Sequence, residues 1–325
     1  MSDLRTQGYA LVGDIGGTHA RFALVASGAV TPEKIEILRC DQYQGLEVAI
    51  RDYLARAGVA SVGRACLAVA SPIHGDRIEM TNNPWRFSVS DIKARFGWPA
   101  FKVINDFTAM ALGVLHVPDN QRVPVCGGPG ESNRPRLVIG PGTGLGVAAL
   151  VPLQGGWVPL ASQGGHVDFA PVDDTEMAIL RSLQRRFGRV SVERILCGPG
   201  LMNLYRSHAE VAGADVRFSD PKDVTAAALA GTDALAHRVL SHFCEILGRV
   251  TGDAALMLGS LGGVYLCGGV LPHFIDFLKH SRFQAGFEDK GRMTDLMRAT
   301  PVQLVTEPHT GLLGAAAALD NPQVA

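Results

Sequence analysis

The sequence predicts an α/β protein, because short apolar runs of strand length alternate with patterns of helical period along its first third. The opening stretch shows a second sign of the same class, since a glycine turn joins two apolar runs there. We expect strands at residues 9–13, 21–25, 64–70 and 101–104.

Helical periodicity is clearest between the second and third of these strands. The stretch GLEVAIRDYLARAG places five apolar residues on one helix face: Leu46, Ile50, Tyr53, Leu54 and Ala57. Further helices are expected at residues 175–188 and 233–260, and short strands at 264–267 and 302–305. The second half of the chain is therefore predicted to be the more helical one.

Composition limits the classes of partner. Thirty basic residues nearly cancel thirty-one acidic ones, so no strong field is directed at nucleic acid or a membrane surface. The uncharged stretches 137–167 and 254–272 are interrupted by glycine and proline, whereas a membrane span needs about 20 continuous apolar residues. We expect buried strands joined by glycine turns there, small-molecule partners, and, because the start MSDLRTQGYALV does not resemble a secretory signal, a cytoplasmic location.

The six cysteines are widely spaced along the chain. No CxxC or CxC pair occurs among them, so neither a zinc site nor a disulfide framework is indicated. We expect reduced thiols in the core.

Two features bear on domain organisation. The loop 117–134 is rich in Pro, Gly, Asp and Asn and is the best candidate for a boundary. In addition, the stretch GGTHARFAL aligns with PGTGLGVAA, so that Gly17-Thr18 falls on Gly142-Thr143, 125 positions later. This similarity predicts one type of hairpin built twice, which would be consistent with an ancient duplication.

The two glycine turns are candidates for phosphate binding. Backbone without side chains lets a polyphosphate come close, although a hairpin that needs positive φ is the alternative explanation for each turn. Neither stretch is a Walker A loop or a Rossmann fingerprint. Asp14, which ends the first apolar run, is placed to direct a Mg²⁺ and its waters toward phosphate, and the hydroxyls of Thr18 and Thr143 are placed to donate to phosphate oxygens.

A phosphoryl-transfer site of this kind needs a base. In VINDFTAMALG an apolar strand ends at Asn105-Asp106 and a helix of small residues begins. Asp106 is therefore a candidate to accept an alcohol proton, and capping of the helix is the alternative role. His166 and Glu193 add polar groups beside glycines, and a purely structural role remains open for the histidine.

A set of motifs spread over nearly the whole chain resembles one family. The chain is similar to the bacterial ATP-dependent glucokinases of the zinc-free type, within the superfamily of sugar kinases, Hsp70 and actin. The motifs that carry this resemblance are GDIGGTHARFAL, ASPIHGD, TNNPW, VINDFTAMALG, GPGTGLGVA, GGHVDFAP, VSVERILCGPGL, LCGGVLP, FEDKGR and GLLGAAAAL.

The resemblance implies a two-domain actin-like fold. A small domain would comprise residues 1–116 and 307–325, and a large domain residues 117–306. The C-terminal helix around 311–319 would cross the helix at Phe107 closely through its Gly and Ala residues and act as a hinge. It also implies glucose and ATP as substrates, a homodimer, and domain closure that excludes water.

The same resemblance implies roles for individual residues. Glucose would be bound by Asn105, Asp106, Gln163, His166 and Glu193, with Asp106 as the base toward the 6-hydroxyl. The ATP phosphates would lie against the two glycine turns, and LCGGVLP would flank adenosine. The residues expected to bind ATP are Asp14, Gly16, Gly17, Thr18, Gly142, Thr143, Gly144, Gly268 and Gly269.

One position departs from the family pattern, which has glutamate where this chain has Gln163. A neutral amide loses charge-assisted hydrogen bonds, so we expect sugar binding to be weaker by about fivefold. Two alternatives stay open: a kinase for fructose, mannose or an amino sugar, since these sugars also offer a primary hydroxyl, and, because of Gln163, a sugar-binding protein with reduced or no turnover. A DNA-binding regulator is disfavoured, because about eight residues precede the first strand and the net charge is −1.

Overall fold

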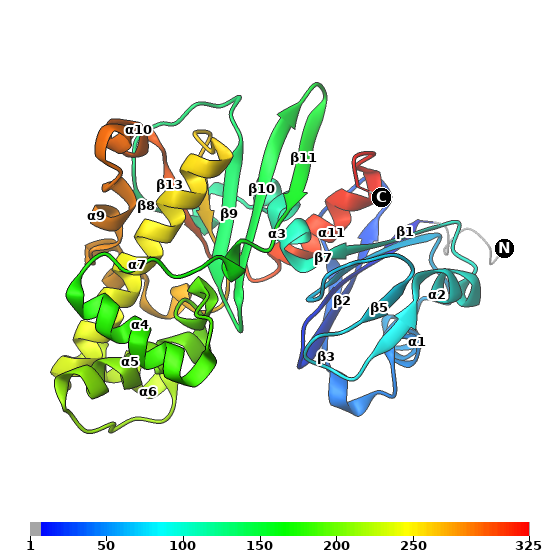
Figure 1. Ribbon diagram of the computed structural model, residues 1–325. Helices are drawn as coiled ribbons and strands as arrows, with labels where there is room; N and C mark the ends of the chain where they lie inside the picture. Colours follow the sequence, from blue (N-terminus) through cyan, green and yellow to red (C-terminus); the bar gives the residue numbers. More distant parts are fainter. Residues whose placement is uncertain (1–7, 325) are drawn as a thin grey trace. The chain divides into compact units, whose positions relative to one another are not determined.

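Two β-sheets organise the chain in the computed structural model, which describes residues 8–324 (Figure 1). The described residues form two compact units. The first comprises residues up to Gln121 together with Leu153–Ala161 and the C-terminal segment from Glu307, and the second comprises Arg122–Pro152 and Ser162–Thr306. The domain bounds expected from the resemblance, with divisions after residues 116 and 306, do not assign 153–161 to the first unit and stay a prediction. The expected absence of a secretory signal concerns the start of the chain, and residues 1–7 lie outside the described part.

Five strands of the described first unit form a sheet in the order β3-β2-β1-β4-β7. β1 pairs antiparallel with β2 through a hairpin, and β1, β4 and β7 run parallel. The strands are β1 (Tyr9–Ile15), β2 (His19–Ala26), β3 (Glu33–Arg39), β4 (Arg64–Val69) and β7 (Ala100–Asn105). β1 and β4 are buried along nearly their whole length, as expected for central parallel strands covered on both faces.

Helices pack against this first sheet. α1 (Leu46–Ala57) buries the apolar face that the sequence predicts, and α2 (Val89–Phe96) follows a short hairpin of β5 (Arg77–Glu79) and β6 (Arg86–Ser88). α3 (Asp106–Gly113) crosses α11 (Thr310–Asp320), as Figure 1 shows in cyan and red. A Cβ on Gly314 would overlap the carbonyl oxygen of Ala109, so the two backbones approach closely because these residues are small.

Six strands among the described residues form the second sheet, in the order β11-β10-β9-β12-β13-β8. β9 and β10 form an antiparallel hairpin, and β9, β12 and β13 run parallel, so the strand order repeats that of the first sheet. The strands are β8 (Arg122–Cys126), β9 (Arg136–Pro141), β10 (Leu145–Leu153), β11 (Gly156–Ala161), β12 (Val264–Leu266) and β13 (Val302–Val305). The hairpin repeat expected from the sequence is therefore a repeat of sheet topology.

The second unit is the more helical one, as predicted. Its helices are α4 (Asp174–Phe187), α5 (Gly198–Ala212), α6 (Pro221–Ala230), α7 (Ala234–Leu258), α8 (Ile275–His280), α9 (Phe283–Glu288) and α10 (Thr294–Ala299). α7 packs against α5, α6, α9 and β9 and is the centre of the unit's apolar core.

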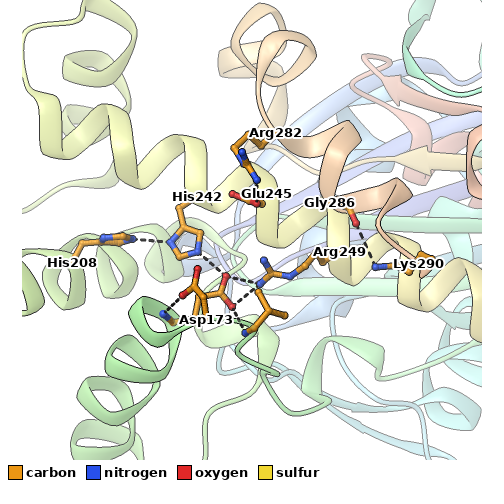
Figure 2. A network of polar contacts seen from close by, with 10 residues as sticks. Asp173, His208, His242, Glu245, Arg249, Arg282, Gly286 and Lys290 are labelled. Atoms are coloured by element: carbon orange, nitrogen blue, oxygen red, sulfur yellow. Dashed lines mark hydrogen bonds and ion pairs between the residues drawn. The ribbon is translucent and has the colours of Figure 1, made fainter. Parts of the chain in front are cut away.

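A polar network links α4, α5 and α7 inside this core. Figure 2 shows His208, His242 and Arg249 in this network. His242 bonds to His208 and to the carboxylate of Glu176, which Arg249 also contacts. The distances are 2.8 Å from His208 Nε2 to His242 Nδ1 and 2.8 Å from His242 Nε2 to Glu176 Oε1. Glu176 is only 1% exposed, and its carboxylate is stabilised because both partners bond to it.

One expectation about the secondary structure was wrong in part. The expected loop 117–134 contains β8, an edge strand that pairs antiparallel with β13. Pro124 lies within it, and proline is tolerated in strands mainly at sheet edges because it donates no ladder hydrogen bond. The cysteines are free thiols, as expected, and all except the half-buried Cys126 are buried. Within residues 8–324, no helix is long and apolar enough to cross a membrane.

Candidate active site

The first glycine turn closes the β1–β2 hairpin. The Gly16 N–H donates to the carbonyl of His19 over 2.9 Å, and Thr18 lies exposed at the tip. Neither Gly16 nor Gly17 has a positive φ, so left-handed backbone does not explain the two glycines. A Cβ on Gly17 would lie 2.7 Å from the Cβ of Asn82, whereas one on Gly16 would meet only the His19 oxygen at 3.6 Å. Close packing thus accounts for Gly17, and Gly16 offers the more open backbone surface.

The TNNPW stretch supports this turn. Asn83 Nδ2 donates to the Gly16 carbonyl over 3.2 Å, and Asn83 Oδ1 accepts from the backbone N–H of Trp85 over 2.7 Å. Trp85 is buried, and its indole N–H donates to the carbonyl of Tyr43. No local sequence pattern indicates that Asn83 supports the glycine hairpin.

Asp14 lies directly before the turn and is half-buried. It faces Arg21 across the hairpin, with 3.3 Å between Asp14 Oδ2 and the Arg21 guanidinium. Burial raises the pKa of Asp14, and the guanidinium charge of Arg21 and the nearby His309 only partly oppose this. A Cβ on Gly311 would lie 3.1 Å from Asp14 Cγ, so the start of α11 also adjoins the carboxylate. Sequence reasoning missed Arg21, although hairpin register alone pairs it with Asp14.

Asn105 and Asp106 occupy the junction of β7 and α3. Asn105 Oδ1 accepts from the N–H groups of Phe107 and Thr108, so Asn105 is the N-cap of α3. Asp106 Oδ1 accepts from the Phe107 N–H over 2.9 Å and from Asn105 Nδ2 over 2.8 Å. Burial, and then the negative charge of Asp14, raise the pKa of Asp106 to about 6. Such a carboxylate is a better proton acceptor than an ordinary aspartate, and it is still ionised at neutral pH.

The second glycine turn joins β9 to β10. The Gly142 N–H donates to the carbonyl of Gly144 over 2.8 Å, and the Gly142 carbonyl accepts from the N–H of Gly198 over 2.9 Å. Thr143 is exposed at the tip, as Thr18 is in the first turn. Neither Gly142 nor Gly144 has a positive φ. A Cβ on Gly144 would lie 2.5 Å from Glu193 Oε2, so the carboxylate occupies the space that a side chain at this position would need.

Three predicted sugar ligands follow β11 or lie close to this turn. Glu193, on the 3₁₀ turn Val192–Arg194, accepts from the Leu145 N–H over 2.8 Å through Oε2. His166 Nδ1 lies 3.8 Å from Glu193 Oε1. Gln163 is exposed and precedes the 3₁₀ turn Gly164–His166, in which its carbonyl accepts from the His166 N–H. The structure therefore brings His166 and Glu193 together beside the Gly142–Gly144 turn.

The same turn forms one side of a cavity of ≈ 680 Å³ within the second unit. This volume is within the range of small-molecule sites. Gly142, Thr143 and Gly269 line it, together with Gly198, Pro199, Met202, Asn203, Arg206, Ser219, Pro221 and Val270. Much of the wall is apolar, and Arg206 supplies a positive charge.

Gly268 and Gly269 have different roles at this cavity. Gly269 lines the cavity, and a Cβ on it would have open space. Gly268 is not part of the cavity wall. Gly268 has a φ of 90°, and a Cβ on it would lie 2.5 Å from the Pro141 carbonyl oxygen. Both the positive φ and the close approach of the Pro141 backbone therefore favour glycine at position 268. Sequence reasoning missed the residues of α5 and the start of α6 that line the cavity, because only tertiary packing brings them to the turn.

Comparison with solved structures places this architecture in a class. The crystal structure of a glucokinase from an Antarctic psychrotroph superposes with a TM-score of 0.87 at 38% identity, covering 96% of this chain and 98% of that one. A ROK family glucokinase from Streptomyces griseus, solved in complex with glucose and AMPPNP, superposes with a TM-score of 0.62 at 19% identity. The match covers 95% of this chain and 98% of that one, and at this identity it shows the shared fold alone. The chain thus has the two-domain actin-like fold of the sugar kinases, as the sequence predicts.

Comparison with sequences identifies the family within this class. A model of the glucokinase family matches residues 11–322. A glucokinase of Marinobacter nauticus is 64% identical over 316 residues, which are 97% of this chain and 98% of the relative. This chain belongs to the glucokinase family.

Proposed function

We propose that this protein transfers the γ-phosphoryl group of ATP to the 6-hydroxyl of glucose, giving glucose 6-phosphate and ADP. Membership of the glucokinase family over nearly the full length supports the reaction. The single structural observation that favours it is Asp106, the first residue of α3 directly after β7, whose carboxylate has a pKa of about 6. In this reaction the sugar oxygen attacks the γ-phosphorus, its proton passes to Asp106, and ADP leaves.

The first unit would supply the base and one phosphate-binding turn. Asn105 holds Asp106 by a 2.8 Å hydrogen bond from Nδ2 to Oδ1, which fixes the carboxylate without neutralising it. Asn105 and Asp106 are proposed to bind the sugar. Gly16, Gly17 and Thr18 are proposed to bind phosphate, with Gly16 as the point of close approach because its Cβ position is open.

The second unit would supply the remaining sugar ligands and the nucleoside site. Gln163, His166 and Glu193 are proposed to hydrogen-bond the sugar hydroxyls. Gly142, Thr143 and Gly144 are proposed to bind phosphate. The ≈ 680 Å³ cavity beside them is proposed to hold the adenosine, with Gly269 in its wall and Gly268 behind it.

Magnesium is proposed to accompany ATP. The described residues contain no cluster of three or more His, Cys, Asp or Glu that could hold a metal by themselves. Mg²⁺ in kinases is commonly held by one or two carboxylates, water and the substrate phosphates, so such a cluster is not required. Asp14 fits this role through water, because it lies near the first glycine turn and its negative charge acts on Asp106. The ion would supply charge neutralisation at the phosphates.

The experiment that tests the function is ADP formation from Mg·ATP against a panel of hexoses, with ³¹P NMR of the product. We expect the highest kcat/KM with glucose and a 6-phosphate ester as product. Turnover of fructose, mannose or an amino sugar in preference to glucose would make this chain a kinase for that sugar. Binding of glucose without turnover would make it a sugar-binding protein, with Gln163 as the first residue to examine.

Location and assembly remain proposals as well. We propose a cytoplasmic homodimer that binds neither nucleic acid nor membrane, composed of domains 1–116 with 307–325 and 117–306. Light scattering of the purified protein at micromolar concentration tests the dimer, and a monomer mass close to 34.5 kDa would contradict it.

A further inference from the structure

Glu193 contacts more than the sugar site proposed above. Its Oε2 accepts from the backbone N–H of Leu145 over 2.8 Å, and Leu145 is the residue at which the second glycine turn becomes β10. The absence of a side chain on Gly144 gives this oxygen its place, since a Cβ there would lie 2.5 Å away. The other oxygen, Oε1, faces His166 at 3.8 Å. The Glu193 carboxylate therefore bonds to the end of the second glycine turn through Oε2 and faces the proposed sugar ligand His166 through Oε1.

The main chain that carries Glu193 also leads to the nucleotide cavity. The Glu193 carbonyl accepts from the thiol of Cys197, which is the N-cap residue of α5. The next residue, Gly198, donates its N–H to the Gly142 carbonyl and lines the cavity. The segment 193–198 thus contacts the glycine turn at two points: through the Glu193 side chain at Leu145 and through the Gly198 backbone at Gly142.

We propose that Glu193 is a positioning residue for the nucleotide as well as a sugar ligand, and that it couples the two affinities. A hydrogen bond to an ionised acceptor is stronger than one between neutral groups, so the carboxylate holds the 142–145 turn in one conformation. A sugar hydroxyl on Oε1 would restrict the same carboxylate further. Each substrate would then favour binding of the other, and such coupling is reciprocal. The coupling to sugar rests on the proposed function, whereas the role of Glu193 in positioning the nucleotide turn does not depend on sugar binding.

The first test measures AMPPNP affinity by calorimetry in the absence of sugar. We expect Glu193→Ala to weaken AMPPNP about tenfold, because the Leu145 N–H and the turn lose their acceptor. Glu193→Gln should weaken AMPPNP less than Glu193→Ala, by about fivefold at most, since an amide oxygen still accepts from Leu145 but without the charge. His166→Ala is the comparison variant: it removes the group that faces Glu193 Oε1 at 3.8 Å but no bond to the turn, so AMPPNP affinity should fall less than in Glu193→Ala.

The second test uses the turn to perturb the sugar. In Gly144→Ala the added methyl group would displace the Glu193 carboxylate without removing it. We expect glucose affinity, measured without nucleotide, to fall about fivefold although Gly144 is not a proposed sugar ligand. This variant also serves if Glu193→Ala fails to fold.

The outcomes separate the inference from the function. Parent-like AMPPNP affinity in Glu193→Ala, or parent-like glucose affinity in Gly144→Ala, would overturn the coupling and leave the glucokinase reaction intact. Parent-like glucose affinity in all Glu193 and His166 variants would instead remove these residues from the sugar site and overturn the sugar half of the inference. Hexose-dependent ADP formation by the parent protein decides the proposed function independently.

Discussion

At the scale of the residue, we predict that the pKa of Asp106 controls the pH dependence of the proposed reaction. Its value of about 6 lies above the ordinary aspartate value because of burial and the charge of Asp14. A base acts only when deprotonated, so kcat/KM should be level above pH 7 and fall about tenfold per pH unit below pH 6. Steady-state rates between pH 5 and 8 measure this profile.

The variant Asp14→Asn tests whether the charge of Asp14 contributes to that pH profile. Asp14→Asn removes the neighbouring charge that raises the Asp106 pKa, so the midpoint of the residual activity should move to lower pH. A midpoint that does not move, or a parent profile without a fall near pH 6, would contradict this account of Asp106.

Gln163 gives a second prediction at the residue scale. We expect Gln163→Glu to tighten glucose binding about fivefold, because a carboxylate forms charge-assisted hydrogen bonds to sugar hydroxyls. Gln163 is exposed and its backbone carbonyl already accepts from the His166 N–H, so the substitution should leave the turn intact. Calorimetry with glucose is the measurement, and unchanged or weaker binding would show that the amide is not the weaker ligand.

At the scale of the element, the crossing of α3 and α11 depends on glycine. A Cβ on Gly314 would overlap the backbone oxygen of Ala109, and one on Gly113 would overlap that of Thr310. We expect Gly314→Ala to lower the free energy of unfolding by about 2 kcal/mol, since overpacking outweighs the gain in helix propensity. Urea denaturation provides the value.

The matched control for this crossing is Gly63→Ala, also in the first unit. A Cβ at Gly63 would have nothing within 4 Å, and its φ is not positive. Its free energy of unfolding should change by less than about 0.5 kcal/mol. Equal effects in the two variants would mean that the close approach of the helices does not explain Gly314.

At the scale of the whole molecule, the network of Figure 2 predicts how stability depends on pH. Burial, and then the charge of His242, lower the pKa of His208 to about 4, with Arg238 acting in the same direction and Glu176 and Asp173 opposing it. Between pH 6.5 and 4 the unfolded chain therefore binds more protons at this histidine. Its contribution to stability is present above pH 6.5 and is lost as the pH falls toward 4.

Asp106 contributes with the opposite sign, because its raised pKa lets the folded state bind the extra proton between the ordinary value and about 6. Asp106 is present in both the parent and His208→Gln, so its contribution cancels in the difference between their free energies of unfolding. From pH 7 to 5, we expect the parent to lose about 1–2 kcal/mol more unfolding free energy than the variant. Parallel curves from urea denaturation at each pH would contradict the assignment to His208.

Much of the fold could be predicted from the sequence, because apolar periodicity determines which face of an element is buried. α1 buries the five residues that its pattern indicates, and the similarity of the two glycine turns corresponds to a repeated sheet topology. β8 was missed because its proline and short length resemble a loop, and only pairing with β13 makes it a strand.

The candidate site was less predictable than the fold. Asp106 and the two turns were found from local motifs. Arg21 follows from the register of the first hairpin, which pairs it with Asp14. Asn83 and the cavity residues on α5 act through contacts with residues distant in sequence, and no local pattern reports such contacts. The Glu193–Leu145 bond belongs to the same group, since it joins residues 48 positions apart.

The most direct measurement of the central claim is glucose-dependent ADP formation by Asp106→Asn beside the parent protein, with glucose and AMPPNP affinities determined for both. Asparagine retains the acceptor for the Phe107 N–H, so the variant should fold and bind both ligands. We expect kcat to fall at least 1,000-fold, toward the upper part of the range typical for loss of a general base. A variant that binds glucose and keeps more than about a tenth of the parent kcat would show that Asp106 is not the base.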